Sequence, residues 1–130
     1  MGLYQIFLAI ILSLSPRLPA SEAEIVARQV DSVATTREEA AMMLTISWYE
    51  TGNRVLSRRL IPFGLSCCPN VCRRSLQECA QLSLRIVRTA KRCSNIMSKV
   101  FGYYHTGRCL PDPYSTRQAT TYQRILRRIP

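Results

Sequence analysis

The stretch that decides the fold is "TTREEAAMMLTISWYETGN", residues 35–53. A threonine at its start can cap a helix, and a glutamate three positions later completes a capping box. An apolar run follows, and Gly52 then supplies a residue that readily ends helices. The sequence therefore predicts one helix with clear ends over this stretch. The candidate caps are Thr35 or Thr36, and their candidate partners are Glu38 or Glu39.

Glu50 stands at the end of this apolar helix. Three- and four-residue spacing places it on one face with Met43, Ile46 and Ser47. Partial burial and the negative end of the helix dipole both disfavour a charged carboxylate there, so we expect Glu50 to favour its protonated form. A protonated carboxyl group is what a general acid needs. The alternative is a structural glutamate that pairs with an arginine such as Arg54.

Length and composition bound the class of protein. A chain of 130 residues suits one domain. Hydrophobic residues make up 47% of it and charged residues 20%, a balance typical of globular proteins and not of disordered chains. The formal net charge of +10 favours polyanionic partners such as nucleic acid, anionic lipid or wall polymers.

Four further segments carry the apolar spacing of amphipathic helices. We find no alternating pattern that predicts a strand, so the predicted fold class is mostly α, a single small helical domain. The segments are residues 21–34, 73–93, 94–109 and 115–129.

The ends of the last two helices and one loop can also be predicted. Ser94 can cap the helix that ends near Gly107, and Ser115 or Thr116 can cap the C-terminal one. Between residues 53 and 70, prolines, a glycine and arginines including Arg58 break any long period. We expect a loop there, the kind of segment on which functional residues often lie.

The first residues resemble a signal peptide. An apolar run precedes two prolines and small residues, too short to span a bilayer, and Ala23 offers a cleavage point. We expect residues 1–23 to be the leader and residues 24–130 the domain. The alternative is a buried amphipathic helix that opens the domain. No later stretch is apolar enough to span a membrane.

The six cysteines predict disulfides, because an even number follows an apparent export signal. A zinc site is disfavoured, since the chain has one histidine and no paired CxxC motifs. If residues 75–93 form one straight helix, its first and last cysteines lie about 21 Å apart and cannot be joined. The pairing is otherwise open. The cysteines are Cys67, Cys68, Cys72, Cys79, Cys93 and Cys109.

Three segments in order, "YETGN", "FGLSC" and "YYHTGRC", resemble motifs of the lysozyme-like and lytic transglycosylase families of bacteria and phages. The resemblance implies a small lysozyme-like helical domain, here braced by disulfides. It implies that Glu50 is the catalytic acid. It also implies substrate contacts from the residues that match or adjoin the motifs: Thr51, Gly64, Leu65, Tyr103, Tyr104 and His105. The sequence departs from the family at Ser66, Cys67 and His105, which stand where methionine, glutamine and asparagine are usual.

The resemblance implies cleavage of peptidoglycan glycan strands. No second carboxylate sits in a recognisable motif, so a single-glutamate mechanism fits better than a two-carboxylate one. We expect a secreted, periplasmic or virion-associated protein that needs no cofactor or metal and binds peptidoglycan or anionic wall polymers.

A second interpretation assigns no role to Glu50. It is a secreted cationic helical protein, stabilised by disulfides, that binds or disrupts anionic membranes or cell walls without catalysis. Only the positive charge favours nucleic-acid binding. The sequence contains no recognisable motif for the recognition of bases, so we do not expect this function.

Overall fold

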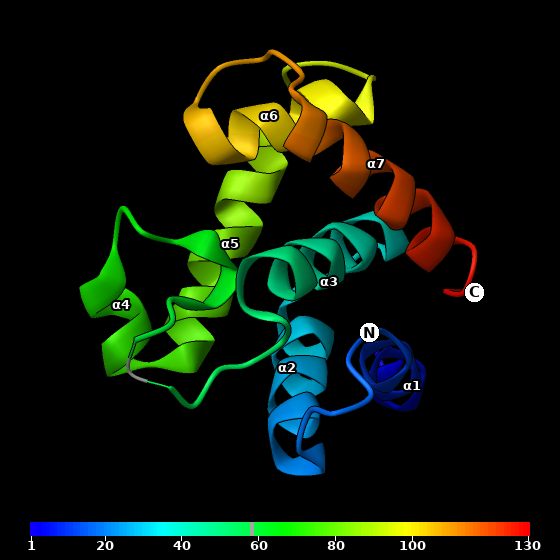
Figure 1. Ribbon diagram of the computed structural model, residues 1–130, viewed down its shortest axis with the longest axis vertical. Coiled ribbons are helices and arrows are strands. Elements are labelled where there is room, and N and C mark those ends of the chain that lie inside the picture. Colours follow the sequence, from blue (N-terminus) through cyan, green and yellow to red (C-terminus); the bar gives the residue numbers. More distant parts are fainter. Residues whose placement is uncertain (58) are drawn as a thin grey trace.

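The computed structural model describes residues 1–57 and 59–130, and every regular element in this part of the chain is a helix (Figure 1). The prediction of a mostly α fold is confirmed. Arg58, predicted within the loop, lies outside the described residues. The elements are α1 (Tyr4–Leu14), α2 (Ala20–Val33), α3 (Arg37–Thr51), the short 3-10 turn η1 (Pro62–Gly64), α4 (Pro69–Arg74), α5 (Leu76–Lys91), α6 (Met97–Thr106) and α7 (Pro113–Leu126).

Helix α3 runs through the middle of the molecule, and the other long helices pack around it (Figure 1). Residues 39–47 are all buried, as in a helix that is surrounded on every side. The Thr36 side chain caps its start by accepting from the Glu39 N–H at 3.1 Å. Gly52 ends it in the left-handed conformation with φ +60°. Both predicted ends are confirmed.

Glu39 ties the start of α3 to α5. Its carboxylate accepts the Arg88 Nε–H at 2.7 Å and the Thr35 backbone N–H at 2.9 Å. Burial raises the pKa of Glu39, but the hydrogen bonds from Arg88 and Thr35 outweigh that effect and lower it from 4.5 to about 2. The ion pair therefore stabilises the junction between the two helices.

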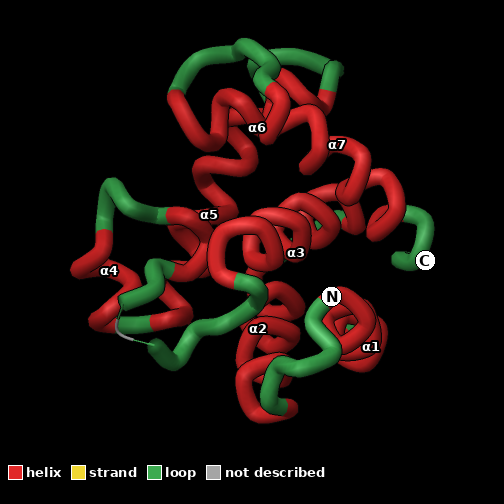
Figure 2. The backbone as a smooth tube through the Cα atoms, viewed as in Figure 1, coloured by secondary structure: helices red, strands yellow, loops and turns green. Residues whose placement is uncertain are grey.

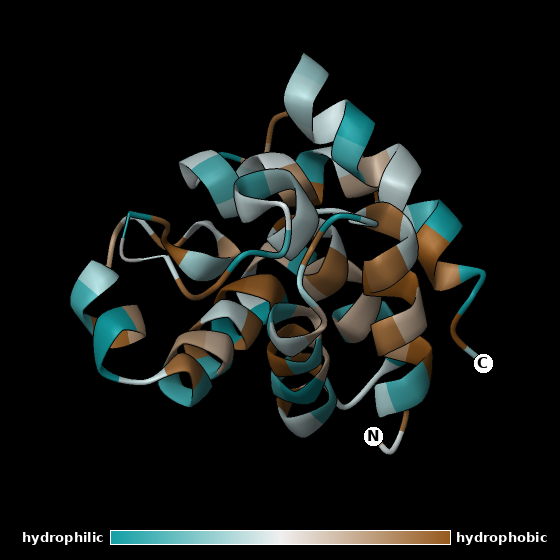
Figure 3. Ribbon diagram, turned by 60° about the horizontal axis from the view of Figure 1, so that its bottom comes forward, coloured by the Kyte–Doolittle hydropathy of each residue, from teal (hydrophilic) through white to brown (hydrophobic). Residues whose placement is uncertain are grey.

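Helix α1 contributes to the same core as the rest of the domain. Phe7, Ile10 and Ile11 are fully buried, and Figure 3 shows the apolar character of the helix that follows the N-terminus. The Ser15 hydroxyl donates to the Gly52 carbonyl at 3.2 Å, which links the end of α1 to the end of α3. This is the arrangement that the buried-helix alternative describes. Removal of a leader after Ala23 stays a prediction.

Two predicted helix caps are wrong. Helix α6 begins after Ile96, and the Ser94 hydroxyl accepts from the Ile96 N–H within the preceding turn. Helix α7 begins after Asp112, whose carboxylate accepts from the Ser115 N–H at 2.7 Å. Pro113 occupies the first helical position, where a proline loses no hydrogen bond, so the helix starts earlier than Ser115.

Four of the six cysteines form disulfides, Cys72 with Cys79 and Cys93 with Cys109. The expectation that Cys79 and Cys93 are not joined to each other is confirmed. The prediction that Cys67 and Cys68 also form disulfides is wrong, because both are free thiols. They are adjacent, and neighbouring Cα atoms across a trans peptide are closer than a relaxed disulfide requires.

The segment between α3 and α4 is mostly irregular, as predicted, apart from the turn η1 (Figure 2). Within residues 1–57 and 59–130, no helix has both the length and the apolar character needed to cross a bilayer.

Candidate active site

Glu50 lies on the last turn of α3 with 24% of its side chain exposed. The Tyr114 hydroxyl donates to its Oε1 atom at 3.2 Å, and His105 Nδ1 lies 3.3 Å from the same oxygen. Among the described residues, Oε2 has no hydrogen-bond partner. The contacts of the Glu50 carboxyl group in the described part of the chain are therefore all made by one of its two oxygens.

The turn η1 brings the backbone against the Glu50 side chain. Phe63 and Gly64 both have positive φ, +57° and +65°. A Cβ atom on Gly64 would lie 2.8 Å from Glu50 Cγ and Cδ, so only glycine fits there without displacing the carboxyl group. Left-handed backbone at a residue as large as Phe63 costs about 1–3 kcal/mol. The Tyr104 hydroxyl helps to hold it by donating to the Phe63 carbonyl at 2.6 Å.

His105 connects Glu50 to α7. Its Nδ1 atom faces Glu50, and its Nε2 atom lies 2.5 Å from Gln118 Oε1. Gln118 is fully buried. Each ring nitrogen of His105 therefore lies beside an oxygen of a neighbouring side chain.

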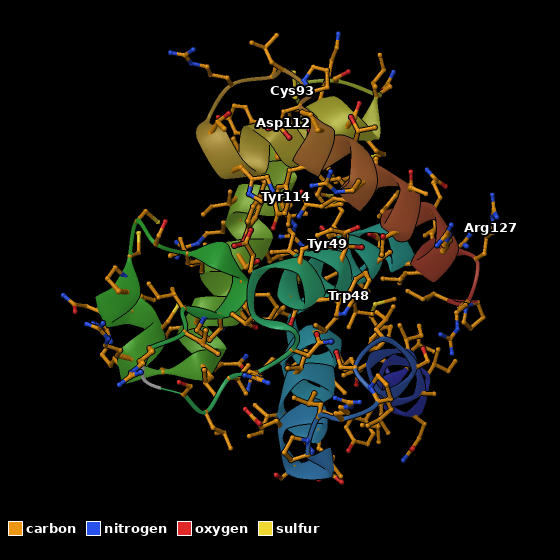
Figure 4. All side chains as sticks on the ribbon, viewed as in Figure 1. Trp48, Tyr49, Cys93, Asp112, Tyr114 and Arg127 are labelled. Atoms are coloured by element: carbon orange, nitrogen blue, oxygen red, sulfur yellow. A yellow bond between two sulfur atoms is a disulfide. The ribbon has the colours of Figure 1, made fainter. Side chains whose placement is uncertain are left out.

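Half-buried aromatic rings continue from Glu50 along α3. The centroid of Tyr114 lies 4.7 Å from that of His105 and 5.6 Å from that of Tyr49, and Tyr49 lies 5.1 Å from Trp48. Figure 4 shows Trp48, Tyr49 and Tyr114 in the region where α7 meets α3. Burial first, and then the nearby charge of Glu50, raise the pKa of Tyr114, so its hydroxyl remains a donor.

The structure brings Gly64 and His105 to Glu50 and places the other predicted residues elsewhere. Thr51 is buried and donates to the Ser47 carbonyl inside its own helix. Leu65 is 2% exposed and belongs to the core.

The two predicted tyrosines lie apart because consecutive residues on a helix point in different directions. Tyr104 is buried, and its hydroxyl also lies 2.9 Å from Ser83 Oγ. It positions η1 and does not contact the Glu50 carboxyl directly. Tyr103 lines a shallow hollow of about 350 Å³ beside Arg85 and Ile86 of α5, which does not include Glu50.

Tyr114 and Gln118 are site residues that sequence reasoning missed. Both lie on α7, and only the packing of α7 against α3 and α6 brings them to Glu50. A polar residue at a buried position of an amphipathic helix was a signal for Gln118. No pattern in the sequence pointed to Tyr114.

No second carboxylate is among the described contacts of Glu50. Asp112 lies two residues before Tyr114, but its carboxylate accepts the Ser115 N–H and caps α7. Hydrogen bonds from Ser115 lower the pKa of Asp112, and the charge of His105 adds to this effect. In the described part of the chain, no cluster of three or more metal-ligating side chains occurs.

A hollow of about 500 Å³ between the 55–62 loop and α4 is larger but does not include Glu50. We place the candidate site by the contacts of Glu50. Comparisons of the chain with protein-family models, with curated proteins and with solved structures found no match.

Proposed function

We propose that this chain cleaves peptidoglycan glycan strands as a lysozyme or lytic transglycosylase, with Glu50 as its general acid. The observation that carries the proposal is the difference between the contacts of the two oxygens of the Glu50 carboxyl group. Tyr114 and His105 hold Oε1, while Oε2 has no partner among the described residues. A carboxyl group held by one oxygen and open at the other is suited to transfer a proton to a ligand.

In this mechanism Glu50 protonates the glycosidic oxygen of the leaving sugar. The resemblance to lytic transglycosylases implies that the acetamido group of the substrate assists bond cleavage. Glu50, now a carboxylate, then accepts a proton from a hydroxyl group of the same sugar, which closes an anhydro ring. The Tyr114 hydroxyl stabilises the carboxylate formed in the first step, because it donates to Oε1.

The contacts of three other acidic residues support a single-carboxylate mechanism. A two-carboxylate glycosidase needs its second acid about 5 to 10 Å from the first. Glu39 is bound to Arg88, Glu78 to Arg74, and Asp112 caps α7. In the described part of the chain, none of these three forms a hydrogen bond or an ion pair with the Glu50 carboxyl group.

The remaining features fit a glycan as substrate. The rings of Trp48 and Tyr49 on α3 and of Tyr114 on α7 are half-buried and lie next to one another, and such rings can pack on sugar faces. The net charge of +10 attracts the protein to anionic wall polymers. Because such polymers lie outside the cytoplasm, we propose a secreted, periplasmic or virion-associated location.

The experiment compares purified full-length wild-type protein with Glu50→Gln for the release of soluble fragments from purified peptidoglycan. Glutamine keeps the shape of the side chain but cannot supply a proton, so we expect release to fall by about 10²- to 10⁴-fold. Glu78→Gln is the matched control, because it makes the same change on α5, in a residue paired with Arg74.

Equal release by the wild-type and Glu50→Gln proteins would remove the enzymatic proposal. It would leave the interpretation as a cationic protein that acts on walls or membranes without catalysis.

A further inference from the structure

His105 links a buried amide to the Glu50 carboxyl group. On one side, its Nε2 atom lies 2.5 Å from Oε1 of Gln118, a residue with no exposed surface. On the other side, its Nδ1 atom lies 3.3 Å from Oε1 of Glu50, whose side chain is 24% exposed. The two ring nitrogens therefore have partners in very different surroundings.

Gln118 turns its amide oxygen toward Nε2 of His105, and its own amide nitrogen is buried without a hydrogen-bond partner among the described residues. An amide oxygen only accepts hydrogen bonds, so the contact with Gln118 requires a proton on Nε2. Without that proton, the lone pair of Nε2 and the lone pairs of the amide oxygen would face each other beside a fully buried residue, which is unfavourable. The other nitrogen, Nδ1, faces a partly exposed carboxyl group, whose oxygen can either accept a hydrogen bond or carry the proton itself.

We propose that Gln118 fixes a proton on Nε2 of His105, so that the proton His105 gains and loses is the one between Nδ1 and Oε1 of Glu50. Gln118 is then a positioning residue, because it acts on Glu50 only through His105. When Nδ1 and Oε1 share one proton, the contact is attractive in both of its forms. In one form an imidazolium faces a carboxylate, and in the other an imidazole faces a carboxylic acid.

The role of this contact in catalysis rests on the function proposed above. Glu50 gives a proton from Oε2 to the leaving glycosidic oxygen and regains one there from the attacking hydroxyl group, while His105 stays beside Oε1. The Tyr114 hydroxyl donates to the same Glu50 oxygen in either form. The other groups that face His105 are the Tyr104 ring on its own helix, the Tyr114 ring and the Asp112 carboxylate before α7.

The test uses nuclear magnetic resonance of the full-length protein labelled with ¹⁵N. His105 is the only histidine, so its ring signals need no assignment. At a pH where the ring is neutral, we expect the proton on Nε2 in the wild-type protein and in Glu50→Gln. In Gln118→Leu, Nε2 loses its acceptor, so we expect the neutral ring to carry its proton on Nδ1, toward Glu50.

Gln123→Leu is the matched control, because it makes the same change at an exposed position of α7. It should leave the proton on Nε2. A wild-type neutral ring protonated on Nδ1 would overturn the inference, since the Gln118 amide would then have to donate and not accept. An unchanged tautomer in a folded Gln118→Leu protein would overturn it as well.

Fragment release separates this inference from the proposed function. If the tautomers behave as expected but the wild-type protein releases no fragments, the assignment of Gln118 stands and the enzymatic proposal fails. If both hold, Gln118→Leu should lower kcat by about tenfold or more and leave KM nearly unchanged, because Gln118 does not touch the substrate.

Discussion

Replacing Gly64 by alanine would place a methyl group against the Glu50 carboxyl group. The new Cβ atom would lie 2.8 Å from Cγ and Cδ of Glu50, so the Glu50 side chain would have to move. The left-handed backbone at φ +65° adds a strain of about 1–2 kcal/mol for any residue other than glycine. Overpacking costs about 1–3 kcal/mol, and the low end applies here because Glu50 is partly exposed. We therefore expect a loss of about 2–3 kcal/mol in unfolding free energy.

Gly107→Ala separates the two contributions. Gly107 also has a left-handed backbone, at φ +74°, but no atom lies within 4 Å of a Cβ built on it. It should lose only the strain of about 1–2 kcal/mol. Urea unfolding of both variants measures the difference. In a Glu50→Ala background, which lacks the atoms that clash, Gly64→Ala should cost no more than Gly107→Ala.

Activity gives the second measurement on the same variants. Because a small displacement of a catalytic group can cost about 10²-fold, we expect Gly64→Ala to lower fragment release by at least tenfold and Gly107→Ala to keep it. The reasoning is refuted if Gly64→Ala is equally destabilising with and without the Glu50 side chain. It is also refuted if the variant retains full release.

Three further predictions follow from the contacts. The Glu39 carboxylate stabilises the fold above about pH 4.5, and this stability is lost as the pH falls toward its lowered pKa of about 2. Since Arg88 is half-exposed, we expect a loss of about 1–2 kcal/mol in urea unfolding, which Arg88→Leu should largely abolish; an unchanged pH profile would contradict this. Iodoacetamide should modify two thiols of the unreduced protein, Cys67 and Cys68, and peptide mass spectrometry that finds none or six would disprove the pairing. Tyr114→Phe should lower kcat about tenfold with little change in KM, whereas unchanged kcat would mean that the hydroxyl does not assist Glu50.

The sequence predicts α3 well because local signals set both of its ends. Thr36 meets a backbone N–H that has no helical partner, and Gly52 adopts a conformation that other residues avoid. These signals act within one turn of the helix, so they can be recognised without knowing the rest of the fold. Glu50 is placed correctly for the same reason, as the last-turn residue of a helix whose end is known.

The surroundings of Glu50 could not be predicted in the same way. Tyr114 and Gln118 reach the site from α7, more than sixty residues later in the chain, and nothing local shows which helix will cover the end of α3. Tyr103 and Tyr104 were predicted together, but their different directions on α6 send one to a separate hollow and the other into the core. Motif matching assigns positions along the chain, whereas the site depends on how the helices pack.

The Cys67 and Cys68 prediction failed for a different reason. An even number of cysteines favours disulfides, but it does not exclude a pair of neighbours that cannot bond without strain. When two cysteines are adjacent, an even number of cysteines therefore does not predict that all of them form disulfides.

Mass spectrometry of the sugar ends in a peptidoglycan digest tests the central claim most directly. The account predicts that full-length wild-type protein creates new glycan ends, that these ends carry the anhydro ring, and that Glu50→Gln creates almost none. Hydrated new ends that depend on Glu50 would retain the catalytic role and change the reaction to hydrolysis. Identical ends from wild-type and Glu50→Gln digests, or no new ends from the wild-type protein, would contradict the account.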